Sequence, residues 1–136
     1  AESCTGGMVA AAITDLAGSS QWFERGFVTY SNQAKQDMLG VAADCLARHG
    51  AVSEQTVRAM ATGALQHANA DLSVAISGIA GPDGGSEEKP VGLVWFAFAR
   101  RGEPVSSSCQ QFSGDRAAVR TQAVTFALQG LLDRLS

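Results

Sequence analysis

Cysteine, histidine and basic residues are scarce in this sequence, and each shortage argues against a class of protein. The 136 residues include three cysteines, two histidines, and 10 lysines and arginines against 13 aspartates and glutamates. Cys4, Cys45 and Cys109 are an odd number at wide spacings, which matches neither a disulfide framework nor a zinc site. A net charge of −3 argues against a general nucleic-acid binder, which usually carries a basic excess. We therefore expect a cytoplasmic protein with no metal and no nucleic-acid partner.

Long apolar runs are also missing. The apolar run at residues 91–99 is too short to cross a bilayer and no signal peptide is visible, so we expect no membrane partner. The chain begins with Ala1 instead of a methionine, and we expect that residues upstream of it have been removed or left out. A chain of this length fits a single domain, spanning 1–136, that can bury its own core.

Hydrophobic periodicity and turn residues divide the chain into helices and strands. Apolar residues at helical spacing predict helices at 5–16, 33–39, 42–48, 53–70 and 116–135. Runs rich in valine, isoleucine and aromatic residues predict strands at 27–30, 72–77, 91–99 and 105–112. Long helices between the early strands favour parallel crossovers, whereas the short connection at Arg101-Gly102 makes a hairpin. The prediction is an α/β domain with a mixed β-sheet and helices packed on its faces.

The segment Ala1-Glu2-Ser3-Cys4-Thr5-Gly6-Gly7 places small polar residues and glycines where a helix is expected to begin. Free N–H groups at a helix start, with the positive end of the helix dipole behind them, favour an oxyanion or a phosphate. Ser3 or Cys4 would then attack a carbonyl group whose oxygen is held by those donors. The plain alternative is a helix that is capped by Ser3 or Thr5.

A serine nucleophile needs a base, and the two histidines are poor candidates. His49 precedes a glycine at an expected helix end, and His67 lies on a long amphipathic helix. A lysine can replace histidine when burial lowers its pKa towards neutrality. Lys35 has a suitable position, because it follows Tyr30, at a strand end, by five residues. The alternatives are a solvated lysine and a half-buried tyrosine ring.

A glycine-rich loop follows the strand expected at 72–77. Its glycines supply positive-φ positions and exposed N–H groups that suit a polar ligand, with a mobile connection as the alternative; they are Gly78, Gly81, Gly84 and Gly85. The acidic residues of the loop lack the spacing of a calcium site, so we expect them to be solvated; they are Asp83, Glu87 and Glu88. Arg116, on the first turn of the last helix, can bind a phosphate or form a local salt bridge.

Further segments join these in a fixed order along the chain. The series is Ala1 to Gly7, Tyr30-Ser31-Asn32-Gln33-Ala34-Lys35, Gly50-Ala51-Val52-Ser53, Ser77 to Gly85, and Phe112-Ser113-Gly114-Asp115-Arg116. This series resembles the C-terminal domain family of the competence/damage-inducible protein CinA in its stand-alone form, over essentially the whole chain. The resemblance implies hydrolysis of the carboxamide of nicotinamide mononucleotide, giving nicotinate mononucleotide and ammonia in bacterial pyridine-nucleotide salvage.

The same resemblance implies roles for individual residues. Ser3 would be the nucleophile, with Lys35 and Tyr30 as its activating partners. Substrate contacts would fall at Ser20, Ser77 and Arg116. Position 77 is commonly threonine in the family and is serine here, which keeps the hydroxyl group. The family domain also carries a helix and a strand ahead of the Ala-Glu-Ser motif, and we expect both to precede Ala1 in the intact protein.

These roles make up an acyl transfer in two steps that needs no cofactor. Neutral Lys35, directly or through Tyr30, would take the proton of Ser3 as the serine attacks the amide carbon. N–H groups near the helix start would hold the oxyanion; they belong to Thr5, Gly6 and Gly7. Arg116 and amides of the glycine loop, at Gly78 and Gly81, would bind the phosphate. The opposite division, with the phosphate at the helix start and the oxyanion at the loop, is the alternative.

Two rival interpretations stay open at the level of sequence. Cys4 is an alternative nucleophile, because thiolates attack amides well and are favoured at helix N-termini. A nucleotide- or phosphate-binding module without turnover would use the same glycines and Arg116. Either kind of protein could be a homo-oligomer, and the apolar helix faces lead us to expect a dimer.

Overall fold

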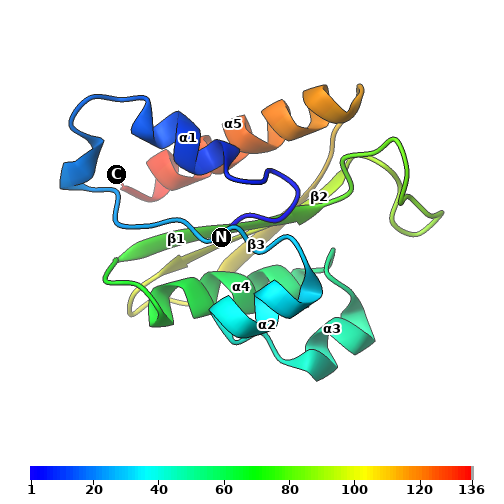
Figure 1. Ribbon diagram of the computed structural model, residues 1–136, viewed down its shortest axis with the longest axis horizontal. Coiled ribbons are helices and arrows are strands. Elements are labelled where there is room, and N and C mark those ends of the chain that lie inside the picture. The colour runs from blue at the N-terminus through cyan, green and yellow to red at the C-terminus, as the bar shows by residue number, and fades with distance from the viewer. Residues whose placement is uncertain (136) are drawn as a thin grey trace.

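Three antiparallel strands form the middle layer of the fold (Figure 1). The computed structural model describes residues 1–135. The strands are β1 (Leu72–Gly78), β2 (Leu93–Arg100) and β3 (Ser106–Gln111), and β2 lies between the other two. Its central place explains its nearly continuous apolar sequence, because both of its faces are covered. The strands expected at 72–77, 91–99 and 105–112 are confirmed, with ends that differ by a residue or two.

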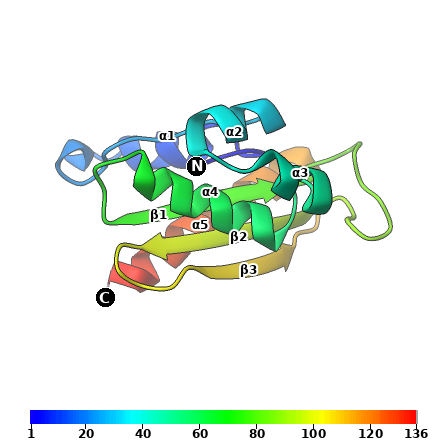
Figure 2. The same ribbon diagram turned by 90° about the horizontal axis from the view of Figure 1, so that it is seen from below.

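Helices cover both faces of this sheet. They are α1 (Met8–Thr14), α2 (Asn32–Leu39), α3 (Ala43–His49), α4 (Glu54–Gln66) and α5 (Arg116–Leu135), and a short 3₁₀ helix, η1 (Ser19–Gln21), follows α1. Figure 1 shows α1 and α5 on one face and α2, α3 and α4 on the other, and Figure 2 shows α4 running along the sheet. The α/β fold with helices on both faces is thus confirmed. Across residues 1–135, none of these helices combines the length and the hydropathy that a bilayer crossing requires.

The two faces of the sheet carry side chains of different size. Phe96 and Phe98 of β2 belong to the core that the sheet shares with α1 and α5. Ala75 and Ala97 belong to the core on the other face, where Met60 of α4 is completely buried. Alternate residues of a strand point to opposite faces, so Ala75, Ala97 and Ala99 lie towards α4, on the same face as Trp95, and let that helix approach the sheet closely.

The parallel part of the sheet is smaller than the sequence predicts. Glu2 forms one parallel bridge to Val28 and another to Ile76, so its backbone lies between the segment that carries Val28 and strand β1. The strand expected at 27–30 is therefore wrong in extent, because only Val28 pairs there. The crossover from Val28 through α2, α3 and α4 to β1 does run in the parallel sense, as expected. Glu2, the residue next to Ser3, is therefore held by backbone pairing with the Val28 segment on one side and with β1 on the other.

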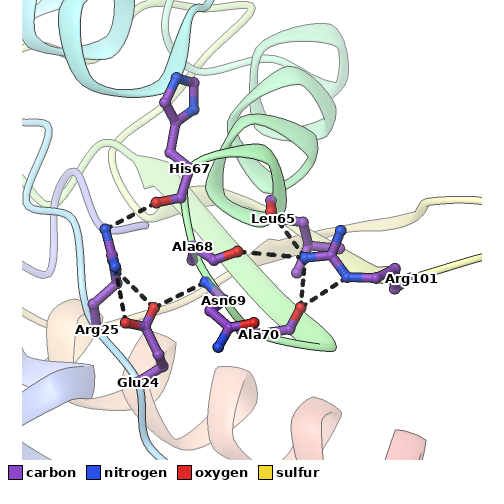
Figure 3. Close-up of polar contacts among 8 residues, drawn as sticks. All are labelled: Glu24, Arg25, Leu65, His67, Ala68, Asn69, Ala70 and Arg101. Carbon is purple, nitrogen blue, oxygen red and sulfur yellow. Dashed lines mark hydrogen bonds and ion pairs between the residues drawn. The ribbon is translucent and has the colours of Figure 1, made fainter.

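Two arginines fix the point where α4 gives way to β1 (Figure 3). Arg25, paired with Glu24, donates to the carbonyl oxygen of His67 at 2.9 Å. Arg101 donates to the carbonyl oxygens at the same corner, those of Leu65, Ala68 and Ala70. These contacts hold residues 67–71 as a turn, so the helix expected to reach about Ala70 ends at Gln66. Cationic groups at a helix C-terminus also complement its dipole.

Helix α2 lies unusually close to α4 because Gly63 has no side chain. A Cβ atom built on Gly63 would lie 2.0 Å from the carbonyl oxygen of Leu39 at the end of α2. Real contacts are never that short, so the two helices depend on a glycine at this position. Since α2 also carries Lys35, the same contact sets the depth of that lysine in the structure.

We expect Gly63→Ala to lower the free energy of unfolding by about 2 kcal/mol or more, since the new methyl group would force α2 away from α4. Helix propensity alone predicts the opposite sign, a gain of about 1 kcal/mol. Thr62→Ala, an exposed change on the same helix, is the matched control and should stay within about 0.5 kcal/mol of wild type. Urea unfolding measures both, and a Gly63→Ala protein at least as stable as wild type would contradict the packing argument.

Candidate active site

Lys35 and Ser3 meet in the interior of the protein. The Nζ atom of Lys35 lies 3.0 Å from the Oγ atom of Ser3, although the two residues are 32 positions apart. Lys35 is completely buried, and Ser3 is 8% exposed. Local structure explains where Lys35 lies. The hydroxyl oxygen of Ser31 accepts the N–H of Ala34 and so caps the start of α2, which places Lys35 on the first turn of that helix.

The other partners of the Lys35 amine are backbone carbonyl oxygens. Its Nζ atom lies 2.7 Å from the oxygen of Thr29 and 3.3 Å from that of Tyr30. Within residues 1–135, no carboxylate forms an ion pair with Lys35. Burial without a countercharge lowers the pKa of Lys35, because desolvation disfavours the ammonium form. A neutral amine has two N–H groups, which the two carbonyls can accept, and one lone pair, which is left for the hydroxyl proton of Ser3.

Ser3 itself is held by backbone hydrogen bonds directly after the bridge residue Glu2. Its N–H donates to the carbonyl oxygen of Ile76 in β1, and its own carbonyl oxygen accepts the N–H of Gly6. On the other side, the N–H of Glu2 donates to Phe27, and the N–H of Thr29 donates to Glu2. The segment that presents the hydroxyl therefore cannot shift without breaking backbone pairing on both sides.

The start of α1 is occupied by the side chain of Glu2. This buried carboxylate accepts hydrogen bonds from the Thr5 hydroxyl at 2.6 Å and from the N–H groups of Val9 and Ala10 at 2.9 and 3.1 Å. The helix begins at Met8, after Gly7 in a positive-φ conformation, and not at Thr5 as the sequence predicts. The prediction of free N–H groups at this helix start is therefore wrong, because Glu2 already supplies the anion.

The residues expected to hold the oxyanion do not line the hollow that opens beside Ser3. Thr5 is completely buried, and the N–H of Gly6 is used by Ser3. Neither they nor Gly7 line that hollow. Sequence reasoning missed Glu2, because a carboxylate ahead of the N-cap is not at a standard capping position and only the fold brings it to the helix start.

A cavity of about 280 Å³ opens beside Ser3. It brings together many of the residues expected at the site, namely Ser3, Tyr30, Ser77, Gly78, Gly81 and Arg116. Ser77 is 1% exposed, and its Oγ atom has no hydrogen-bond partner within residues 1–135. A buried hydroxyl without a partner on the wall of a cavity is available to a polar ligand.

Tyr30 and Arg116 meet at the rim of this cavity. The Tyr30 ring is 63% exposed, and the Arg116 guanidinium lies 3.4 Å from its hydroxyl oxygen. Arg116 also donates to the carbonyl oxygen of Gly81 at 2.8 Å. Tyr30 contacts Lys35 through its backbone carbonyl and not through its hydroxyl group. Lys35 thus contacts the Ser3 hydroxyl directly, and it contacts Tyr30 through the backbone.

Ser20 is the substrate-contact candidate that lies elsewhere. It is exposed on η1 and lines a separate hollow of about 620 Å³ between η1, α1 and the start of β1. Neither histidine lines the cavity, since His49 ends α3 and His67 follows α4. Within residues 1–135, no three His, Cys, Asp or Glu side chains cluster closely enough to hold a metal ion.

The rival nucleophile Cys4 has the wrong protonation state. Its thiol is buried, and burial raises its pKa to about 11, although nearby N–H groups and the guanidinium groups of Arg116 and Arg120 act in the opposite direction. A thiol at neutral pH is not a nucleophile. The geometry thus favours the hydroxyl of Ser3.

Known proteins share both the sequence and the fold. A model of the CinA C-terminal domain matches residues 1–135. Nicotinamide-nucleotide amidohydrolase PncC of Escherichia coli strain K12 is 68% identical over 132 residues, which are 96% of this chain and 79% of that protein. A CinA-like protein of Geobacter sulfurreducens is 53% identical and matches 99% of this chain over 32% of its own length. The crystal structure of competence/damage inducible protein CihA from Agrobacterium tumefaciens superposes with a TM-score of 0.97, at 48% identity, over 99% of this chain and 82% of that one.

We expect the lowered pKa of Lys35 to be visible in the stability of the protein. In the pH range between its lowered pKa and about 10.4, the unfolded chain holds a proton on Lys35 that the folded chain lacks, so stability rises with pH by up to about 1.4 kcal/mol per unit. Lys35→Met removes this contribution, and the difference between the two proteins isolates it. Urea unfolding at several pH values measures that difference, which would be independent of pH if Lys35 were charged in the folded state.

Proposed function

The chain belongs to the CinA C-terminal domain family, and on that premise we propose that it is an amidohydrolase that converts nicotinamide mononucleotide to nicotinate mononucleotide and ammonia. The observation that carries the proposal is the buried contact of 3.0 Å between Lys35 and Ser3. A purely nucleotide-binding module has no use for an amine held without a countercharge against a hydroxyl group. The reaction would belong to pyridine-nucleotide salvage in the cytoplasm.

In the first step, Ser3 forms an ester with the substrate. Neutral Lys35 takes the hydroxyl proton while the Oγ atom of Ser3 bonds to the amide carbon, which gives a tetrahedral oxyanion. The C–N bond then breaks, and the Lys35 ammonium returns its proton to the departing nitrogen, so ammonia leaves. In the second step, Lys35 takes a proton from water, the hydroxide attacks the ester carbon, and Ser3 regains its proton as the acid is released.

The glycine loop is the better source of oxyanion donors in this proposal. The start of α1 is already occupied by Glu2, whereas Gly78 lines the cavity together with Ser3. One such donor is typically worth about 3–4 kcal/mol of transition-state stabilisation. Ser77 offers a free hydroxyl on the same wall.

The phosphate group of the substrate would bind at the rim. Arg116 keeps part of its guanidinium at the surface there, beside the Tyr30 hydroxyl. Planar guanidinium groups suit phosphate oxygens, and the second hydrogen bond of Arg116, to Gly81, ties the arginine to the loop. In this arrangement Tyr30 contributes its ring and hydroxyl to substrate binding and its carbonyl to the position of Lys35. We further propose that the active protein is a dimer.

Ser3→Ala should reduce ammonia release from nicotinamide mononucleotide by at least about 1,000-fold, because the ester is proposed to form on the hydroxyl that this change removes. Binding of the mononucleotide, measured by calorimetry, should be largely retained. Cys4→Ser is the matched control on the neighbouring residue and should keep most of the activity. Activity lost in Cys4→Ser and retained in Ser3→Ala would assign the chemistry to the thiol, and binding without any ammonia from wild type would identify a non-catalytic module.

The rate should increase with pH through the lowered pKa of Lys35, since only the neutral amine can accept the proton of Ser3. Below that pKa, kcat/KM should fall about tenfold per pH unit. Lys35→Arg should be inactive at every pH because the guanidinium keeps its proton. A rate that is level from acid to neutral pH in wild type, or an active Lys35→Arg protein, would remove lysine from the role of base.

A further inference from the structure

Lys89 connects the glycine loop to a helix that is distant in sequence. Its Nζ atom donates to the carbonyl oxygen of His49, the last residue of α3, at 2.7 Å. Figures 1 and 2 both show α3 and the loop between β1 and β2 at the same end of the molecule. An ammonium group at a helix C-terminus is favoured by the helix dipole.

The acceptor side of this contact is shaped to receive the lysine. Gly50 follows His49 with φ 76°, and a Cβ atom there would lie 3.1 Å from the Lys89 ammonium. The Gly50 carbonyl oxygen accepts the hydroxyl groups of Ser53 and Thr56, which fixes the connection between α3 and α4. These hydrogen bonds fix the Gly50-Ala51-Val52-Ser53 segment beside the carbonyl group that accepts from Lys89. The mechanism leaves this segment without a role.

Other hydrogen bonds also hold the loop in place. At its base, the N–H of Ile79 donates to Leu93, and the N–H of Gly92 donates to Ile79. Near its tip, Ser86 and Lys89 close a turn through two hydrogen bonds. The base of the loop is thus closed by backbone pairing, and Lys89 adds a hydrogen bond from the outer part of the loop to α3.

The substrate cavity lies between the two parts that Lys89 joins. Ala51 and Val52 of the α3–α4 connection line one side, and loop residues from Gly78 to Gly84 line the other. We propose that Lys89 is a positioning residue, which holds the glycine loop against the α3–α4 connection and so keeps the nucleotide cavity formed before substrate arrives. This inference rests on the proposed function for the identity of the nucleotide.

The expected effect is on binding and not on the chemical step. Lys89 does not line the cavity and makes no contact with Ser3 or Lys35, whose positions depend on Glu2, β1 and α2. A loop that is ordered in advance spares the ligand the cost of ordering it. Without the contact, the substrate must order the loop itself, so affinity falls while the rate at saturation stays.

Lys89→Met keeps most of the side-chain stem and removes the donor, whereas Lys89→Arg restores a donor for the His49 carbonyl. We expect Lys89→Met to raise KM for nicotinamide mononucleotide roughly tenfold, with kcat within about twofold, and Lys89→Arg to return KM towards wild type. Glu88→Gln, an exposed change on the same loop that lines no part of the cavity, is the control. Titration of Ser3→Ala and Ser3→Ala/Lys89→Met proteins with the mononucleotide measures affinity without turnover and should show the same ratio.

Hydrogen exchange without substrate provides a readout that does not depend on turnover. Amides of residues 83–89 and 51–52 should exchange several-fold faster in Lys89→Met than in wild type or Glu88→Gln. Unchanged exchange together with unchanged affinity would overturn the inference, and so would a lower kcat accompanied by a lower melting temperature, which marks a purely structural role. If wild type releases no ammonia, the proposed function fails, and the exchange data still decide whether Lys89 holds the loop.

Discussion

A lysine amine buried without a countercharge is the constraint on which the rest of this structure depends. Removing an ammonium from water is costly, so burial lowers the pKa of Lys35, and the fold must satisfy its N–H groups. The carbonyls of Thr29 and Tyr30 do so. Their positions follow from the pairing of Thr29 with Glu2, which also presents Ser3. The proposed nucleophile and base are thus aligned by one short stretch of backbone pairing.

The packing of helices around the sheet supports that alignment. Small residues of β1 and β2 let α4 approach the sheet, and Gly63 in turn lets α2 approach α4. Lys35 is carried inward by this stack of close contacts. The depth of the amine, and with it the pKa, is therefore a property of packing over several layers and not of the residues next to Lys35 in sequence.

Much of the architecture could be predicted from local patterns. The apolar run of β2, the polar β3 and the long amphipathic α5 each carry a strong periodicity, and the capping serines Ser31 and Ser53 mark the true starts of α2 and α4. The Tyr30–Lys35 segment and the glycine loop were correctly expected to reach one crevice with Ser3. These inferences succeeded because each depends on neighbours within a turn or a strand.

The errors arose where a distant group decides the local conformation. The segment around Val28 looks like a strand, but its single parallel bridge follows from where Glu2 lies. The start of α1 looks open to an anion, but a carboxylate from the same chain fills it. Ser20, a substrate contact implied by the family resemblance alone, lies on η1 at another hollow. Sequence spacing contains none of these distances.

The absence of a carboxylate partner for Lys35 within residues 1–135 has a consequence for the encounter with a cationic ring. The pyridinium ring of nicotinamide mononucleotide carries a permanent positive charge close to its carboxamide. An ammonium in that place would repel the ring, whereas an uncharged amine does not. In the proposed function, the arriving substrate would select the basic form of the lysine, and the bound cation would in turn make that lysine harder to protonate.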